Sequence, residues 1–226
     1  MSFKMRSCAL AAAMAALLGG CGVHSVLLIK PRLPQNQTKV QAVSVFLPQF
    51  KEDREIPADD ADGADLLVGE LRNGFGVVMN YLDLDVPPPT VVRDSIKGFL
   101  EGAGYTVVSK KADRTPDMPV VGGKVGTFQV SIDASAGGGF APAAVADVEF
   151  ELYVRAGGKV VAERSFAGRK IQHGFAVGIP TIESAGNQAM EEALDKAADF
   201  IESREFSDAL KGIASKADDK EDPDGE

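Results

Sequence analysis

The sequence predicts an α+β fold, a single domain in which an antiparallel-rich sheet packs two main helices on one face. The sheet is indicated by residues 147–155, where apolar side chains alternate with charged ones, as in a strand with one buried face. The helices are indicated by residues 91–100 and 181–204, whose apolar side chains recur along one helical stripe. A chain of 226 residues is long enough for one such domain.

Further strands are predicted along the chain by β-branched and apolar runs between turn signals. These runs are residues 40–47, 66–71, 77–84, 105–109, 120–133 and 160–171. Asn73-Gly74 supplies the positive φ of a tight turn and predicts a hairpin between the second and third of them. Gly157-Gly158 predicts a second hairpin, which joins residues 147–155 to residues 160–171.

Each predicted helix begins beside a possible capping residue. Thr90 precedes the first helix and Thr181 opens the second, and both can accept a hydrogen bond from a free backbone N–H. A short helix near residues 205–213 is expected to follow. Residues 215–226 are rich in acids and predict a disordered tail.

The composition excludes several classes of function. Asp and Glu total 33 against 24 Lys and Arg, a net charge of −9, which argues against a nucleic-acid partner. Two cysteines and two histidines leave little material for a metal site or a Cys/His nucleophile. We therefore expect no cofactor, no metal and no catalytic residue.

The first twenty residues predict a lipoprotein signal peptide. Lys4 and Arg6 precede an apolar stretch, residues 9–18, that is too short to span a bilayer and fits a secretory leader. The stretch ends in Leu18-Gly19-Gly20-Cys21, which resembles the bacterial lipobox. Cys21 is then the lipid attachment site and the first residue of the mature protein.

This cleavage sets the predicted organisation of the chain. Residues 1–20 are the signal peptide, 21–39 an acylated cysteine with a proline-containing tether, 40–214 the α+β domain and 215–226 the acidic tail. Within the tether, the largely apolar residues 26–30 predict a short strand before the proline-containing linker. Gly22, rather than Asp, follows the cysteine, which by resemblance to enteric lipoproteins predicts the periplasmic face of the outer membrane. The inner membrane is the alternative, because this sorting rule varies between bacteria.

Candidate catalytic groups are few, and each has a simpler structural explanation. His24 falls in the predicted tether and His173 in a loop beside Gly174. Asp147, Glu149 and Glu151 share one face of a strand, where paired carboxylates are conceivable but a solvated face explains them equally well.

An apolar loop, residues 174–180, precedes the last helix. We expect it to fold over the end of the core. Exposed, it would instead form a partner contact through Phe175, Val177 and Ile179.

The order of these features resembles the YajG family of uncharacterised bacterial lipoproteins. The resemblance rests on the lipobox, a strand leading to Asp53-Arg54, the pattern Gly104-Tyr105-Thr106-Val107, the Gly174-Phe175 loop and Asn187-Gln188-Ala189. It covers roughly residues 40–210, and the acidic tail and residues 137–139 depart from it. The family offers no catalytic residue to transfer, and Arg54 is expected to pair with an acid near a strand end.

The sequence thus favours a non-enzymatic binding or accessory module. It would be anchored to the membrane through its N-terminal lipid and contact an unidentified envelope protein. Two alternatives stay open: an auxiliary subunit of an envelope transporter or activator of a cell-wall synthase, and a periplasmic glycan or cell-wall hydrolase. A hydrolase should have a cleft with two converging carboxylates of separated pKa, whereas an adaptor should expose an apolar patch.

Overall fold

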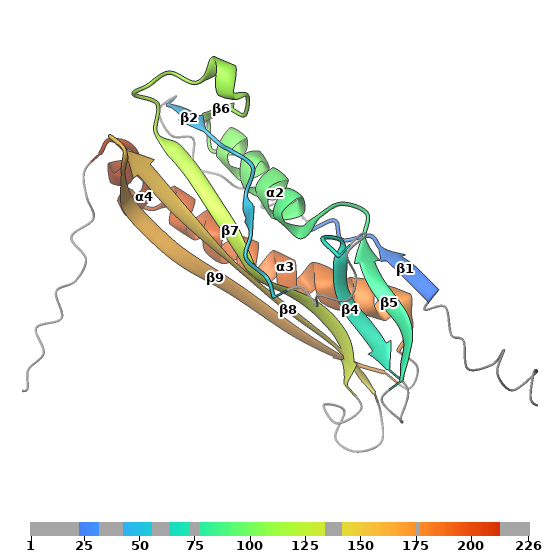
Figure 1. The fold of residues 1–226 in the computed structure, drawn as a ribbon. Helices are drawn as coiled ribbons and strands as arrows, with labels where there is room; N and C mark the ends of the chain where they lie inside the picture. The colour runs from blue at the N-terminus through green and yellow to red at the C-terminus, as the bar shows by residue number, and fades with distance from the viewer. Residues whose placement is uncertain are drawn as a thin grey trace, which may run out of the picture.

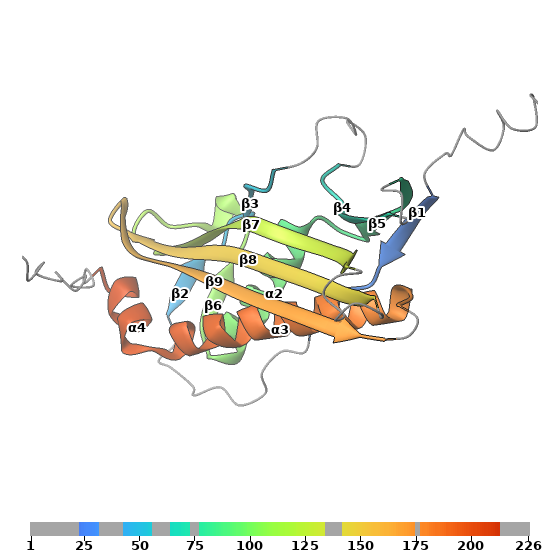
Figure 2. The ribbon, with the colours of Figure 1, turned by 90° about the horizontal axis from the view of Figure 1, so that it is seen from below.

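The computed structural model describes residues 23–31, 43–55, 64–72, 77–133, 142–174 and 177–212. These residues form two sheets and a layer of helices (Figure 1). The predicted α+β fold class is confirmed, with the helices on one face of the large sheet (Figure 2). The structure adds a second, smaller sheet to the single sheet that the sequence predicts.

The large sheet is built around three long antiparallel strands. Five of its six strands lie side by side in the order β6 (Thr106–Val108), β2 (Ser44–Phe46), β7 (Val120–Asp133), β8 (Ala143–Ala156) and β9 (Lys159–His173). The sixth, β3 (Lys51–Glu52), pairs in parallel with β7 next to β2. Gly157 and Gly158 have positive φ and turn β8 into β9, which confirms the predicted hairpin.

The helices cover the inner face of this sheet. They are α2 (Pro88–Gly102), α3 (Ile179–Glu202) and the short α4 (Arg204–Leu210). α3 runs along β8 and β9, and α2 lies over β6 and β7 (Figures 1 and 2). The first helix starts earlier than predicted, because Pro88 and Pro89 occupy its first turn, where a missing N–H costs nothing. Thr90 is therefore a helix residue and not its cap.

The small sheet contains β1 (Val23–Leu27), β5 (Val78–Leu84) and β4 (Leu67–Arg72), in that order. β4 and β5 form the predicted hairpin, whose turn residues 73–76 lie outside the described residues. β1 pairs in parallel with β5. Residues 21–39 were predicted to form a tether. This prediction is wrong for the described residues 23–31, because they belong to the folded domain.

The first residues of the domain are also fixed to α3. The backbone N–H groups of Leu28 and Lys30 donate hydrogen bonds to the side chains of Glu183 (2.9 Å) and Asn187 (2.7 Å). Leu27 and Ile29 are buried. The short strand predicted at residues 26–30 is present but begins earlier, at Val23. Its pairing with β5 was not predicted, because the partner lies more than fifty residues away along the chain.

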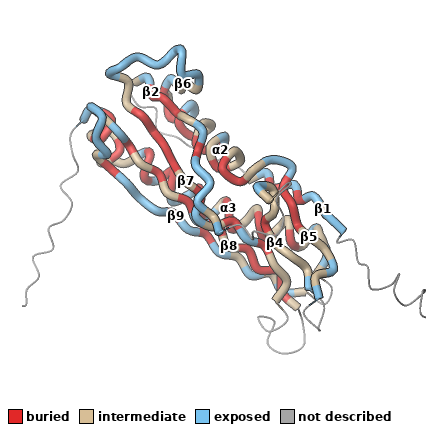
Figure 3. The backbone as a smooth tube through the Cα atoms, in the orientation of Figure 1, coloured by how far each residue is buried: buried red, intermediate tan, exposed pale blue. Residues whose placement is uncertain are grey.

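A single hydrophobic core lies between the large sheet, the helices and the inner face of the small sheet (Figure 3). Phe150, Phe166, Phe200 and Phe206 pack in a chain of ring contacts that links β8, β9, α3 and α4. α3 approaches β9 closely at Gly168, where a Cβ would lie 2.0 Å from the carbonyl oxygen of Ala189. Within the described residues, no helix combines the length and apolar character needed to span a bilayer.

Candidate functional site: a cleft between the two sheets

A cleft of about 790 Å³ opens where the small sheet meets the edge of β7. Its walls come from three segments far apart in sequence: residues 53–55 after β3, 67–72 of β4, and 126–132 of β7. β4 packs closely against β7 beside the cleft. The approach requires glycine at position 69, because a Cβ there would lie only 1.8 Å from the carbonyl oxygen of Val130. The two sheets therefore meet at a fixed point beside the cleft.

One edge of the cleft is a strand edge of β7. β3 pairs with β7 up to Val125, and the N–H of Asp53 donates to the carbonyl of that residue at 3.0 Å. Beyond Val125, no strand in the described part of the chain pairs with this edge, although β8 pairs with the other edge as far as Asp133. Backbone groups of an unpaired strand edge are available to an extended ligand.

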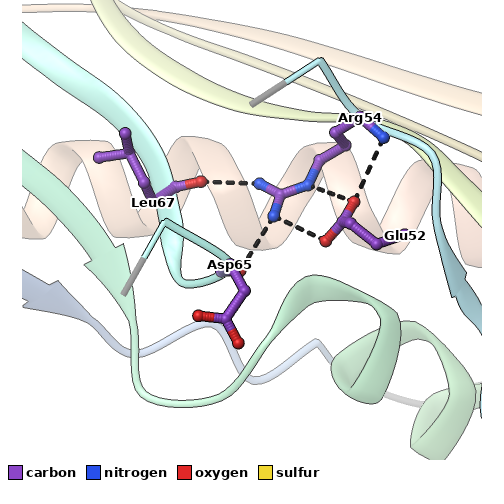
Figure 4. A network of polar contacts seen from close by, with 4 residues as sticks. All are labelled: Glu52, Arg54, Asp65 and Leu67. Carbon is purple, nitrogen blue, oxygen red and sulfur yellow. Dashed lines mark hydrogen bonds and ion pairs between the residues drawn. The ribbon is translucent and has the colours of Figure 1, made fainter. Parts of the chain in front are cut away.

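Arg54 holds the two walls of the cleft together (Figure 4). Its guanidinium donates two hydrogen bonds to the Glu52 carboxylate, at 2.7 and 2.8 Å. It also donates to the carbonyl oxygens of Leu67 (2.7 Å) and Asp65 (3.0 Å), at the start of β4. The side chain of Arg54 is 7% exposed. The prediction that it pairs with an acid near a strand end is confirmed.

The other charged groups that line the cleft include two that are held in ion pairs. Glu70 pairs with Arg72 on β4. Asp53 lies 3.9 Å from the ammonium group of Lys124. The cleft thus offers a strand edge, two acids in ion pairs and an exposed third acid, Glu55.

A carboxylate pair does occur, but it lies outside the cleft. Glu151 of β8 and Glu163 of β9 interact on the outer face of the large sheet, and a hydrogen bond between them raises the pKa of Glu163. Glu151 also binds Lys124 at 3.1 Å, and this hydrogen bond raises the pKa of Lys124. Neither glutamate lines the cleft. Asp147 pairs with Arg169 at 3.4 Å on the same face, and Glu149 is exposed there.

The two histidines differ from each other in surroundings. His173 is exposed at the end of β9. His24, predicted to lie in a tether, is part of β1: its Nδ1 lies 2.6 Å from the carboxylate of Asp83, and its ring stacks on Tyr81. Sequence reasoning missed this cluster because it missed the pairing of β1 with β5.

The remaining predicted site residues are only partly described. Cys21 and Phe175 lie outside the described residues. Val177 and Ile179 are partly buried and pack against the core. A partner contact through Phe175, Val177 and Ile179 stays a prediction, as does lipid attachment at Cys21.

No family model and no curated protein matches this chain. Similar solved structures include a Xanthomonas campestris protein of the DUF330 family, at 14% identity and a TM-score of 0.51, which covers 79% of this chain and 94% of that chain. They also include a neuraminyllactose-binding hemagglutinin homolog from Helicobacter pylori, at 13% identity and a TM-score of 0.46, covering 82% and 100%. A minor lipoprotein from Acinetobacter baumannii is similar at 10% identity and a TM-score of 0.37, covering 78% and 98%.

Likeness at such identities concerns the fold alone. The Xanthomonas structure shows that this arrangement of sheets and helices occurs in another bacterial protein. The resemblance to the YajG family stays a prediction.

Proposed function

We propose that this chain is a lipid-anchored lipoprotein of the bacterial envelope, a non-enzymatic binding or accessory module that faces the periplasm. The observation that carries the binding role is the cleft between β4 and β7, with its open strand edge. The lipobox Leu18-Gly19-Gly20-Cys21 supports the lipid anchor. Gly22, which follows it, supports a location in the outer membrane.

The chemistry of the cleft supports binding rather than hydrolysis. A hydrolytic site needs two carboxylates that converge on a substrate in a cleft and differ in pKa. The pair with a raised pKa, Glu151 and Glu163, lies on an open sheet face. Three acids line the cleft, Asp53, Glu55 and Glu70. Two of them face a cation, since Glu70 is paired with Arg72 and Asp53 lies 3.9 Å from Lys124.

The ligand that fits best is an extended segment of another envelope protein. Such a segment can add to the β7 edge through backbone hydrogen bonds, while its side chains fill the cleft. The segment could belong to an envelope transporter or to a cell-wall synthase. The crosslinking experiment below distinguishes these two partners.

The anchor is tested by metabolic labelling with an alkyne analogue of palmitate. The wild-type protein is expected to carry the label and to float with the membrane fraction, whereas Cys21→Ser should lose the label. An unlabelled wild-type protein would contradict the lipoprotein assignment.

The binding role is tested by a photo-crosslinking amino acid at Gln129, an exposed residue that lines the cleft. The matched control is Glu149, which is exposed on the neighbouring strand but outside the cleft. We expect one envelope protein to be crosslinked in intact cells from Gln129 and not from Glu149, and its identity distinguishes a transporter from a synthase. Equal crosslinking at both positions, or at neither, would contradict the cleft as the binding site.

A further inference from the structure

The outer face of the small sheet is apolar. Val26 and Leu28, from β1 and the residue after it, alternate with the buried Leu27 and therefore point outward. Met79, on β5, is counted with this face, because Tyr81 and Asp83 of the same strand pair in register with His24 and Val26, whereas a register shift at Met79 leaves Val77 outside this pattern. Val26, Leu28 and Met79 are between 50% and 58% exposed, and Figure 3 colours most of β1 as exposed.

Polar side chains on this face bind one another. His24 binds the carboxylate of Asp83 and covers it, so that Asp83 is only 9% exposed. Glu70, which lies opposite Tyr81 in the sheet register, pairs with Arg72. A charge that has its partner loses less on leaving water than an isolated charge does. The face therefore suits an apolar neighbour.

The position of Cys21 identifies that neighbour. β1 begins at Val23, two residues after Cys21. Two residues span at most about 7 Å, since an extended chain covers roughly 3.5 Å per residue. An acylated Cys21 lies at the membrane interface, so the start of β1 must lie at that interface as well. This step rests on the proposed lipid anchor.

We propose that the outer face of β1 and β5 lies on the phospholipid surface, with Val26, Leu28 and Met79 in contact with lipid. The contact is apolar rather than ionic, because the chain has a net charge of −9 and Glu70 is already paired with Arg72. The face therefore fits a surface of zwitterionic phospholipid, and its contact with lipid should persist in high salt. The β8–β9 turn and α4, at the end of the molecule opposite β1, then point away from the membrane (Figures 1 and 2).

The test places an environment-sensitive fluorophore on the lipidated protein in vesicles of phosphatidylcholine and phosphatidylethanolamine. Met79→Cys carries the probe, and Val160→Cys is the matched control, since Val160 is also an exposed apolar residue but lies at the β8–β9 turn. Acylated Cys21 has no thiol to label. Lipids with brominated acyl chains should quench the probe at residue 79, with a blue shift, and leave the probe at residue 160 unchanged.

A second variant tests whether the apolar face itself makes the contact. Leu28→Asp, combined with the probe at residue 79, should abolish the quenching because the new carboxylate resists transfer from water. Val160→Asp with the same probe should keep it. Persistence of the quenching in Leu28→Asp would overturn the proposal.

The outcomes separate the two proposals. Protein that floats with the vesicles but shows equal quenching at residues 79 and 160 overturns the membrane contact and leaves the anchor standing. Protein that does not float overturns both, since the contact rests on the anchor. Dimers formed by a bis-maleimide at residue 79 would assign the face to a second copy and overturn the membrane contact.

Discussion

The two sheets share one core but present opposite outer faces. On the large sheet, the outward residues of β8 and β9 are largely polar, and several are joined in ion pairs such as Asp147–Arg169 and Lys124–Glu151. On the small sheet, the outer face includes the half-exposed apolar side chains of Val26, Leu28 and Met79. Both sheets bury their inner faces against the same helices.

This difference shows that the two outer faces are adapted to different surroundings. A strand face in water needs polar side chains, and the large sheet supplies them. On the small sheet, Asp83 is hydrogen-bonded to His24 and Glu70 is paired with Arg72. Exposed apolar residues gathered on one face indicate a contact surface rather than a solvent surface.

The difference between the two sheets is tested most directly by truncating one apolar side chain in each of them. Phe150→Ala, on the inner face of the large sheet, should lower the free energy of unfolding by about 3–5 kcal/mol because it leaves a cavity in the core. Met79→Ala, on the outer face of the small sheet, should change it by less than about 0.5 kcal/mol. Urea denaturation of the two variants measures both values, and a large loss in Met79→Ala would show that its face is structural.

The next prediction concerns the close approach of α3 to the large sheet. Gly168→Ala places a methyl group against the backbone of Ala189 and Ala193, so the helix must shift away from β9. Such overpacking costs about 1–3 kcal/mol. Gly126→Ala is the control, because a Cβ there meets nothing within 4 Å. Equal midpoints of urea unfolding for the two variants would contradict this packing.

The sequence predicted the large sheet better than the small one for a physical reason. β8 has a clear apolar alternation, and its partner β9 follows after a two-residue turn, so local pattern and local chain reversal agree. β1 is short, shows no clear alternation of apolar and polar residues, and pairs with residues far along the chain. No local pattern encodes such a pairing.

The candidate site was predictable only in part. The Asp53-Arg54 pair stood out in the sequence, and Arg54 does bind an acid, Glu52, from the strand just before it. The cleft itself joins three distant segments, so it becomes visible only when the two sheets are assembled. His24 was assigned to a tether because its partners Tyr81 and Asp83 belong to a strand with which no pairing was predicted.

A smaller effect is expected from replacing Arg54, whose hydrogen bonds connect the large sheet to the small one. Arg54→Ala leaves the Glu52 carboxylate and the carbonyls of Leu67 and Asp65 without this donor, at a cost of about 2 kcal/mol. Hydrogen exchange should accelerate in residues 64–72 more than in β8. Arg54→Lys should recover little, since an ammonium group cannot reproduce the fork of donors. Unchanged exchange in β4 would show that the sheets meet without this clamp.

The smallest expected effect lies on the outer face of the large sheet and depends on pH. Interaction with Glu151 raises the pKa of Glu163 above its ordinary value of 4.5, so the folded state binds this proton more tightly than the unfolded state does. The stability that this proton provides is present below the unfolded pKa and is lost as pH rises through the raised one. Glu163→Gln removes the repulsion between the two carboxylates, so it should stabilise the protein slightly at about pH 7 and have less effect at about pH 4. Urea midpoints of both proteins at the two pH values measure this difference. A stabilisation that is equal at both would mean that the two carboxylates do not share a proton in solution, and that Lys124 alone balances the charge of Glu151.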